Sequence, residues 1–307
     1  MVPATLPDLA RKLTVAARHR VWVRWQPDPE LMSIGDAEEF KVFEAEGWST
    51  QAGTYGGLTG AITSRLAEPL LDAAGVRPDW RVLDVATGPG YVAERAAARG
   101  ARVVGIDLAD GMLQLARQRV GGLELLRADA EELPFDDTSF DAVVGGFVIN
   151  HLPRPQRALA EAERVLVSGG QVAFSVWDRP ERMRVFGVVT EAIEAAGVDR
   201  DDALPAGGPD PYRFADEGEF RALLEAADLV EVAVRTVELT HRVAGTKELV
   251  RGLLGSSVRT ATRLRAMGAV ARRRTTAALE RMVEPYRTSD GALELPVAAK
   301  LASGVKR

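Results

Sequence analysis

The glycine-rich segment at residues 82–93 constrains the fold of this 307-residue chain more than any other part of its sequence. It reads VLDVATGPGYVA, so that Gly88, Gly90 and Ala93 satisfy the spacing G-x-G-x-x-G/A. Apolar residues typical of a buried strand precede the glycines, and a helical pattern begins at Tyr91. A strand, a glycine turn and a helix in this order are typical of the ligand-binding edge of a doubly wound α/β sheet.

Strand and helix patterns alternate on both sides of this turn. Strands are predicted at residues 81–85, 102–106, 123–127, 141–144, 171–176, 230–239 and 293–301. Helices are predicted at residues 59–74, 91–99, 111–118, 154–166, 180–197 and 216–227, and across most of 246–286. Strands separated by helices of this size pair in parallel through right-handed crossovers. The sequence therefore predicts a doubly wound, Rossmann-like α/β sheet with helical cap insertions before and after its sixth strand.

This pattern divides the chain into six segments. They are an N-terminal helical segment and lid (1–58), the ligand-binding core (59–178), a helical cap insertion (179–215), a core helix with the sixth strand (216–243), a second helical cap insertion (244–290) and the last core strand (291–307). Residues 27–40 are rich in proline and acidic side chains and predict a linker. The basic, weakly amphipathic first 25 residues favour a helix packed on the body, with a transit peptide as the alternative.

The composition excludes several classes of site. The chain has no cysteine, which removes disulfides, thiolate metal sites and cysteine nucleophiles. Its histidines, His19, His151 and His241, lie far apart in the sequence, so no metal site is predicted. The net charge of −5 argues against a nucleic-acid partner. The longest apolar run, residues 142–149, is far shorter than the ~18 residues of a membrane span, and we expect a cytoplasmic protein with no membrane partner.

The charge of Asp84 distinguishes between two cofactors that the glycine turn could bind. The same spacing, with Asp107 downstream of Gly88, also fits a dinucleotide. A dinucleotide places its anionic pyrophosphate at the helix N-terminus, where the carboxylate of Asp84 would repel it. S-adenosylmethionine (SAM) carries an ammonium and a sulfonium and no phosphate. The sequence therefore favours SAM, and an NAD(P)-dependent oxidoreductase is the lesser alternative.

Residues at the ends of the next three strands complete the predicted SAM site. Asp107 can accept hydrogen bonds from the ribose hydroxyls. Asp129 can accept one from the adenine amino group, with Ala130 beside the ring. Met112 is a soft partner for one face of the purine, and Gly146 lets a ligand approach the backbone closely. Acidic residues thus follow three successive strands at one edge of the sheet.

Four segments resemble class I SAM-dependent methyltransferases, and among these the ubiquinone/menaquinone-type and bacterial natural-product enzymes. They are residues 82–93 (VLDVATGPGYVA), 103–107 (VVGID), 127–135 (RADAEELPF) and 139–152 (SFDAVVGGFVINHL). The chain departs from the family at Ala86, where glycine is usual, and at Thr87, where cysteine is frequent. The resemblance implies a seven-stranded sheet with an antiparallel last strand. It also implies that upstream residues close over SAM, for which Trp48, Tyr55 and Thr59 are the candidates.

The activity implied by the resemblance is methyl transfer from SAM, with S-adenosylhomocysteine (SAH) as product. A SAM-binding fold that has diverged into a cyclase or a regulatory module is the alternative. The predicted cofactor-binding residues are Tyr55, Thr59, Asp84, Ala86, Thr87, Gly88, Gly90, Asp107, Leu108, Met112, Asp129, Ala130 and Gly146.

The acceptor is constrained mainly by the sequence that follows the fourth strand. Methyltransferases acting on base or glutamine nitrogens often carry an Asn/Asp-Pro-Pro-aromatic element there, whereas this chain reads Gly145-Gly146-Phe147-Val148. Aromatic side chains farther along the chain could instead line an apolar pocket. We therefore expect a small, largely apolar or aromatic metabolite, methylated on oxygen, carbon or nitrogen. The candidate substrate-binding residues are Trp48, Phe147, Asn150, Trp177, Met183, Phe186, Tyr212 and Phe214.

Two histidines are candidates for a general base, which is needed only if the acceptor must lose a proton. His151, just after the fourth strand, ranks first, and His241, beyond the sixth, ranks second. The sequence shows no obvious acid beside either, and a purely structural role is the alternative for both.

An arginine-rich stretch lies in the second cap insertion. It holds seven arginines and no acidic residue: Arg251, Arg259, Arg263, Arg265, Arg272, Arg273 and Arg274. A solvated helix face or a contact in a homo-oligomer is favoured. A site for an anionic acceptor or for RNA is the alternative.

Overall fold

The structure, a computed structural model, describes residues 34–198, 204–205 and 208–307. The N-terminal stretch interpreted above as a helix or a transit peptide lies outside these residues. Within them, a seven-stranded sheet has the order β3-β2-β1-β4-β5-β7-β6. The strands are β1 (Arg81–Val85), β2 (Arg102–Asp107), β3 (Glu124–Arg127), β4 (Phe140–Gly146), β5 (Leu166–Trp177), β6 (Leu229–Val243) and β7 (Leu293–Lys306).

The strand directions confirm the predicted topology. β1 pairs in parallel with β2 and β4, β2 with β3, and β4 with β5. β7 inserts between β5 and β6 and is antiparallel to both. This is the doubly wound, Rossmann-like sheet with an antiparallel last strand that was expected.

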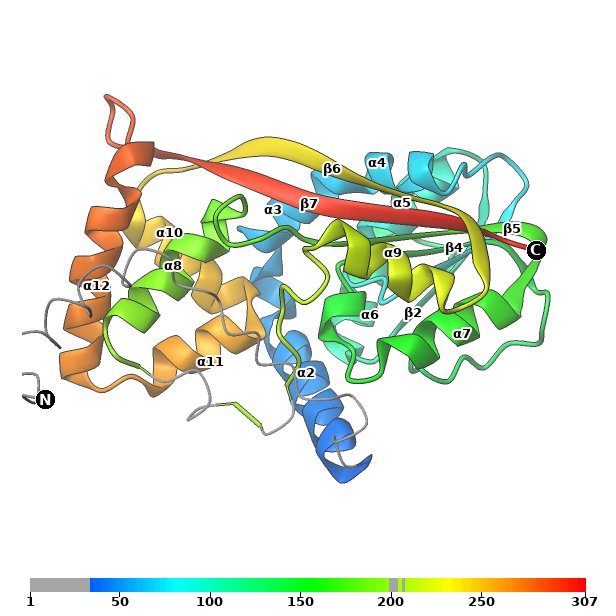
Figure 1. The fold of residues 1–307 in the computed structure, drawn as a ribbon, viewed down its shortest axis with the longest axis horizontal. Coiled ribbons are helices and arrows are strands. Elements are labelled where there is room, and N and C mark those ends of the chain that lie inside the picture. Colours follow the sequence, from blue (N-terminus) through cyan, green and yellow to red (C-terminus); the bar gives the residue numbers. More distant parts are fainter. Residues whose placement is uncertain (1–33, 199–203, 206–207) are drawn as a thin grey trace, which may run out of the picture.

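Helices cover both faces of the sheet, and a group of them extends beyond one end (Figure 1). The helices are α2 (Ile34–Tyr55), α3 (Thr59–Thr63), α4 (Ala67–Ala73), α5 (Tyr91–Ala98), α6 (Asp110–Arg119), α7 (Pro155–Val165), α8 (Arg184–Ala195), α9 (Glu217–Glu225), α10 (Thr246–Ser256), α11 (Val258–Ala266) and α12 (Ala269–Val283). The 3-10 turns are η2 (Ser64–Leu66), η3 (Ile149–His151) and η4 (Glu284–Tyr286). No helix among the described residues is long and apolar enough to cross a membrane.

The core lies on both faces of the sheet because successive side chains of a strand point to opposite sides. Val82 belongs to one apolar cluster and Leu83 to the other, and both are fully buried. On β7, Leu301 and Ala302 divide between the two clusters in the same way. The near-continuous apolar runs of the central strands follow from this double burial.

The inserted helices gather where β6 and β7 run past the rest of the sheet. In Figure 1, the long β6 and β7 extend toward α12, and α8, α10 and α11 lie at the same end. α12 packs on α8, and α10 packs on α2. The caps therefore lie beyond the carboxyl end of β4, next to the glycine turn, where they can cover a ligand.

Several element boundaries differ from the sequence prediction. Residues 34–40, predicted as part of a linker, begin α2 instead. Ala37 and Phe40 are buried, and the burial of these apolar side chains stabilises the helix. The helix predicted at residues 59–74 is broken by η2. The predicted helical stretch at 246–286 is three helices and a 3-10 turn, and β6 and β7 are both longer than predicted.

Candidate functional site

The glycine turn after β1 has the backbone conformation that its residues predict. Gly88 and Gly90 have positive φ angles of 54° and 84°, which glycine adopts without strain. A Cβ on Gly90 would also lie 3.3 Å from the Cβ of Ala116 on α6. Thr87 N donates to Ile106 O at 2.8 Å, which ties the turn to β2. The turn thus leads directly into α5 with its backbone facing the edge of the sheet.

Asp84 lies beneath this turn with one carboxylate oxygen lacking a partner. Its Oδ2 accepts from Thr87 Oγ1 at 2.6 Å and from Ala93 N at 3.0 Å. Its Oδ1 is buried and has no hydrogen bond. Burial raises the pKa of Asp84 to about 7, although the two hydrogen bonds act in the opposite direction. A cationic ligand group beside Oδ1 would supply the missing interaction.

Asp107, the last residue of β2, holds the turn and the start of α6 together. Its Oδ2 accepts from Gly88 N and its Oδ1 from Ala109 N, both at 2.8 Å. Burial raises the pKa of this carboxyl group to about 6, against the effect of those hydrogen bonds. Each carboxylate oxygen can accept a further bond, and Asp107 borders a large cavity.

This cavity, of about 1040 Å³, opens at the carboxyl ends of β1, β2 and β4. The predicted cofactor residues on its wall are Tyr55, Thr59, Ala86, Gly88, Asp107, Leu108, Met112, Ala130 and Gly146. Asp84 and Thr87 border a smaller neighbouring pocket of about 50 Å³, which shares Ala86, Gly88 and Gly146 with the large one. Gly90 lines neither and serves the turn and its packing instead.

The residues of this region fit SAM. The unpartnered Oδ1 of Asp84 suits an ammonium group, and the Asp107 carboxylate suits a pair of hydroxyls. Met112 and Ala130 present apolar surface for a purine. Ligand pockets are typically about 300–1,000 Å³, so the cavity has room for the cofactor and a second molecule. Tyr55, whose pKa burial raises to about 12, stays neutral and adds a further wall.

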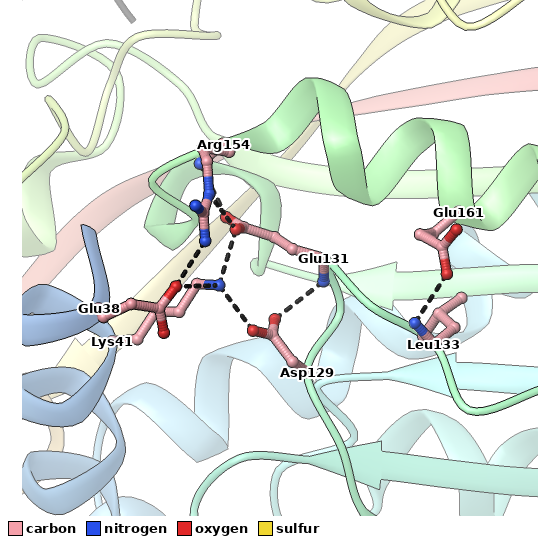
Figure 2. Close-up of polar contacts among 7 residues, drawn as sticks. All are labelled: Glu38, Lys41, Asp129, Glu131, Leu133, Arg154 and Glu161. Atoms are coloured by element: carbon pink, nitrogen blue, oxygen red, sulfur yellow. Dashed lines mark hydrogen bonds and ion pairs between the residues drawn. The ribbon is translucent and has the colours of Figure 1, made fainter. Parts of the chain in front are cut away.

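Asp129 does not have the role that was predicted for it. Its Oδ2 accepts from Lys41 Nζ at 2.6 Å and its Oδ1 from Glu131 N at 2.8 Å, so that both oxygens are engaged (Figure 2). Asp129 does not border the cavity, although Ala130 does. We therefore assign Asp129 to the contact with Lys41 and not to adenine recognition, since it does not line the cavity.

Lys41 belongs to a group of ion pairs that fixes α2 to the core. Figure 2 shows Lys41 and Glu38 on α2 facing the segment after β3 and the start of α7. Lys41 Nζ lies 2.7 Å from an oxygen of Glu131, which is almost fully buried. Arg154 Nε lies 2.7 Å from the same carboxylate, and its Nη2 contacts Glu38 at 2.6 Å. We call Glu38, Lys41, Asp129, Glu131 and Arg154 the α2 clamp.

A second polar group surrounds His151 at the cavity wall. His151 Nδ1 lies 2.9 Å from Glu44 Oε2, which also accepts from Trp48 Nε1 at 2.8 Å. Arg259 Nε donates to Glu44 Oε1 at 2.8 Å. Burial would raise the pKa of Glu44, but the charges of Arg259 and His151 hold it at about 2. An ionised Glu44 favours the tautomer of His151 with its proton on Nδ1, which leaves Nε2 as an acceptor.

The other histidine candidate lies elsewhere. His241 is on β6, opposite Leu295 of β7, and does not border the cavity. Burial and the charge of Arg65 lower its pKa. The structure thus separates His241 from the residues predicted to bind cofactor and substrate, and we do not assign it a role as a base.

Most of the candidate substrate residues do meet in the cavity. Those on its wall are Trp48, Phe147, Asn150, Trp177, Phe186 and Tyr212. Phe147 and Trp177 stack with ring centroids 3.8 Å apart, and Phe186 packs on Trp177. Neither Met183 nor Phe214 lines the cavity: Met183 is buried in the core, and Phe214 packs on Phe220. These two are corrected from substrate contacts to core residues.

The arginine-rich stretch is not a uniform solvated face. Arg259 is 9% exposed and borders the cavity together with Arg263. Arg251, Arg265 and the triplet at 272–274 do not border it. The preferred interpretation therefore fails for Arg259, because α11 packs against α2 and turns this side chain toward Glu44.

Sequence reasoning missed Lys41, Glu44 and Arg213 on the cavity wall. Lys41 and Glu44 were hidden in a segment interpreted as linker and lid, although their spacing of three residues places them on one helix face. Arg213 lies in a turn before α9 and donates to Ile149 O and Leu152 O. No pattern in the sequence pairs these residues with η3, since the contacts join distant segments.

Comparison with known proteins agrees with this geometry. Residues 83–174, from β1 into β5, match the family of methyltransferase domains. The match shows that this part of the chain is similar to methyltransferase domains, in keeping with the topology of the sheet. Two relatives, each named as a methyltransferase, match parts of the chain.

The first relative is the demethylmenaquinone methyltransferase of Renibacterium salmoninarum, 39% identical over 118 residues. The second is the ubiquinone/menaquinone biosynthesis C-methyltransferase UbiE of Brucella abortus, 34% identical over 176 residues. The matches cover 38% and 52% of this chain. They cover 50% and 65% of the relatives, so the chain spans less than two thirds of either one.

Two solved structures share the fold. One, a protein of Bacillus halodurans, has a TM-score of 0.51 and 22% identity, covering 78% of this chain and 98% of its own. The other, the YcgJ protein of Bacillus subtilis, has a TM-score of 0.50 and 21% identity, covering 79% and 98%. At these identities the likeness concerns the architecture.

Proposed function

We propose that this protein is a SAM-dependent methyltransferase acting on a small, largely apolar or aromatic metabolite of quinone-type or bacterial secondary metabolism. The observation that carries the proposal is one cavity that combines two kinds of wall. It is lined by Asp107 and Gly88 of the glycine turn and also by the stacked Phe147 and Trp177. A cofactor and an apolar acceptor can therefore meet within it.

The residues of the chain supply alignment, exclusion of water and a proton acceptor. SAM bound at this site would supply an electrophilic methyl group, and Asp84, Asp107 and the glycine turn are the residues that would hold it. Phe147, Trp177 and Phe186 hold the acceptor in an apolar environment. If the acceptor loses a proton, Nε2 of His151 takes it, while Glu44 stabilises the imidazolium from the Nδ1 side.

The test is methyl transfer itself. Purified protein is incubated with SAM labelled in its methyl group and a metabolite extract, and products are separated by mass. A labelled product supports the proposal and identifies the acceptor. An unlabelled isomer instead supports the diverged, non-methylating alternative. Binding of NAD(P) but not of SAH in calorimetry would overturn the choice of cofactor.

Two further parts of the proposal concern location and assembly. We place the protein in the cytoplasm, with no nucleic-acid partner, in keeping with its net charge of −5. We also propose self-association through the inserted helices. Cell fractionation, and light scattering of the purified chain at several concentrations, test these two points.

A further inference from the structure

The turn η3, which carries His151, has polar groups around it that lack partners. Asn150 is 0% exposed and borders the cavity, yet neither its Nδ2 nor its Oδ1 makes a hydrogen bond. Buried amides are almost always satisfied, and an unsatisfied one indicates a ligand or a water at that position. Asn150 offers one donor direction and one acceptor direction to whatever occupies the cavity.

Arg213 lies beside the same turn. Its Nη2 donates to Ile149 O, at 2.8 Å, and to Leu152 O, which are the carbonyl groups on either side of Asn150 and His151. Its Nε is buried and has no hydrogen-bond partner. Arg213 also borders the cavity. Nη2 of Arg213 thus holds η3 in place, and Nε can donate to a further acceptor.

No described carboxylate pairs directly with the guanidinium of Arg213, although the charges of Asp210 and Glu131 act on it from farther away and favour its charged form. Among the described residues, no aspartate or glutamate oxygen lies within 4.0 Å of its guanidinium nitrogens. Glu44 is occupied by Arg259 and His151, and Asp210 accepts from the backbone of Tyr212 at 2.9 Å. Burial, and then the charge of Arg259, lower the pKa of Arg213 to about 9. At neutral pH the guanidinium is still charged. An anion bound in the cavity would compensate the charge of this buried group.

We propose that the acceptor is an aromatic hydroxy acid whose carboxylate is bound by Arg213 and Asn150. A carboxylate accepts from Arg213 Nε and from Asn150 Nδ2, and a neighbouring hydroxyl donates to Asn150 Oδ1 or faces His151. Both Asn150 and His151 border the cavity, so the acceptor is proposed to carry a hydroxyl as well as the carboxylate. The inference rests on the proposed function and narrows its substrate class.

The test compares three probes with the same naphthol ring in protein saturated with SAH. They are 1-hydroxy-2-naphthoic acid, 1-hydroxy-2-naphthamide and 1-naphthol, and calorimetry at pH 7.5 measures the affinity of each. The acid and the amide are matched in shape, and the third lacks the carboxyl group. We expect the acid to bind at least tenfold more tightly than the amide, which corresponds to about 1.4 kcal/mol. Equal affinity of acid and amide, or no binding of the acid, overturns the inference.

Variants test whether Arg213 causes the preference for the acid over the amide. Arg213→Met should reduce the preference for the acid to within twofold, and Arg213→Lys should retain part of it. Arg179→Met is the matched control, because Arg179 borders the same cavity but is largely exposed and paired with Asp216 at 2.9 Å. A preference retained in Arg213→Met, or lost in Arg179→Met, contradicts the assignment.

The outcome is separable from that of the proposed function. SAH binding is measured first for the wild type and each variant. If SAH binds but the acid has no advantage, the substrate class is wrong and the methyltransferase proposal stands. If SAH does not bind the wild type, the proposed function itself fails. Should Arg213→Met not fold, the comparison of acid and amide in the wild type still decides the inference.

Discussion

Asp84 combines a raised pKa with an unpartnered oxygen at the cofactor end of the site. A carboxyl group with a pKa of about 7 is largely protonated at pH 6 in the free protein. An ammonium ligand binds its ionised form, so that binding must then release a proton. The affinity for the ligand should therefore fall as the pH falls through 7.

We predict that SAH binds about tenfold more weakly at pH 6.0 than at pH 7.5, since each pKa unit corresponds to about 1.4 kcal/mol. Asp84→Asn should weaken binding at pH 7.5 by at least as much and should flatten the pH dependence. Calorimetry at both pH values measures these effects. The control is Asp110→Asn, because Asp110 is an exposed acid of α6. A wild-type affinity that does not change with pH would refute the role given to Asp84.

The contact between Glu44 and His151 can be tested before the methyl acceptor is known, because it should determine the tautomer of His151. Nitrogen-15 NMR should find His151 of the wild type protonated on Nδ1, and Glu44→Gln should shift the population toward the Nε2 tautomer. Once an acceptor is available, His151→Ala should lower kcat by about 10²–10⁴-fold if the acceptor must lose a proton. His241→Ala serves as the control, and an effect of similar size there would contradict our assignment.

The α2 clamp is the feature that matters most among the elements. α2 carries Glu44, Trp48 and Tyr55 into the site, and the clamp fixes its first half to the segment after β3. Because Glu131 is almost fully buried, it depends on Lys41 and Arg154 for compensation of its charge. The position of the cavity wall that α2 supplies thus depends on these ion pairs.

Lys41→Met should destabilise the docking of α2 by about 2 kcal/mol, the usual worth of a hydrogen bond to a charged group. Hydrogen exchange of the α2 amides should rise more than that of β1 or β4. Arg127→Met is the control, because it removes an exposed ion pair with Asp110. It should change the stability of α2 docking by less than about 0.5 kcal/mol. Uniform loss of protection across the chain would show that the clamp does not act locally.

For the whole molecule, burial on both faces of the sheet dominates stability. Leu301 of β7 is 1% exposed, and β7 joins β5 to β6. Leu301→Ala should therefore cost about 2–5 kcal/mol of unfolding free energy, measured by urea denaturation. Val42→Ala, at an exposed apolar position of α2, is the control and should cost less than about 0.5 kcal/mol. A loss below 1 kcal/mol for Leu301→Ala would contradict the packing described here.

The parts of this fold that the sequence predicts are those with a local signal. The glycine turn at Gly88 and Gly90 and the alternation of strands and helices depend on neighbouring residues, and they locate the sheet and its functional edge. Contacts between distant segments leave no such signal. Asp129 was predicted to bind the ligand because it follows the third strand. Its partner Lys41 lies 88 residues away along the chain, so their contact leaves no local pattern. Glu44 could not be matched with His151 for the same reason.

The place of β7 in the sheet has a consequence for synthesis of the chain. Trp177 of β5 pairs with Ala299, and the whole of β6 reaches the sheet through β7. Until residues 293–306 have left the ribosome, the edge of β5 has no neighbour there and β6 has no partner strand. Such unpaired apolar edges invite association with other chains. We expect the nascent chain to need chaperones until residues 293–306 have emerged and β7 can join β5 to β6.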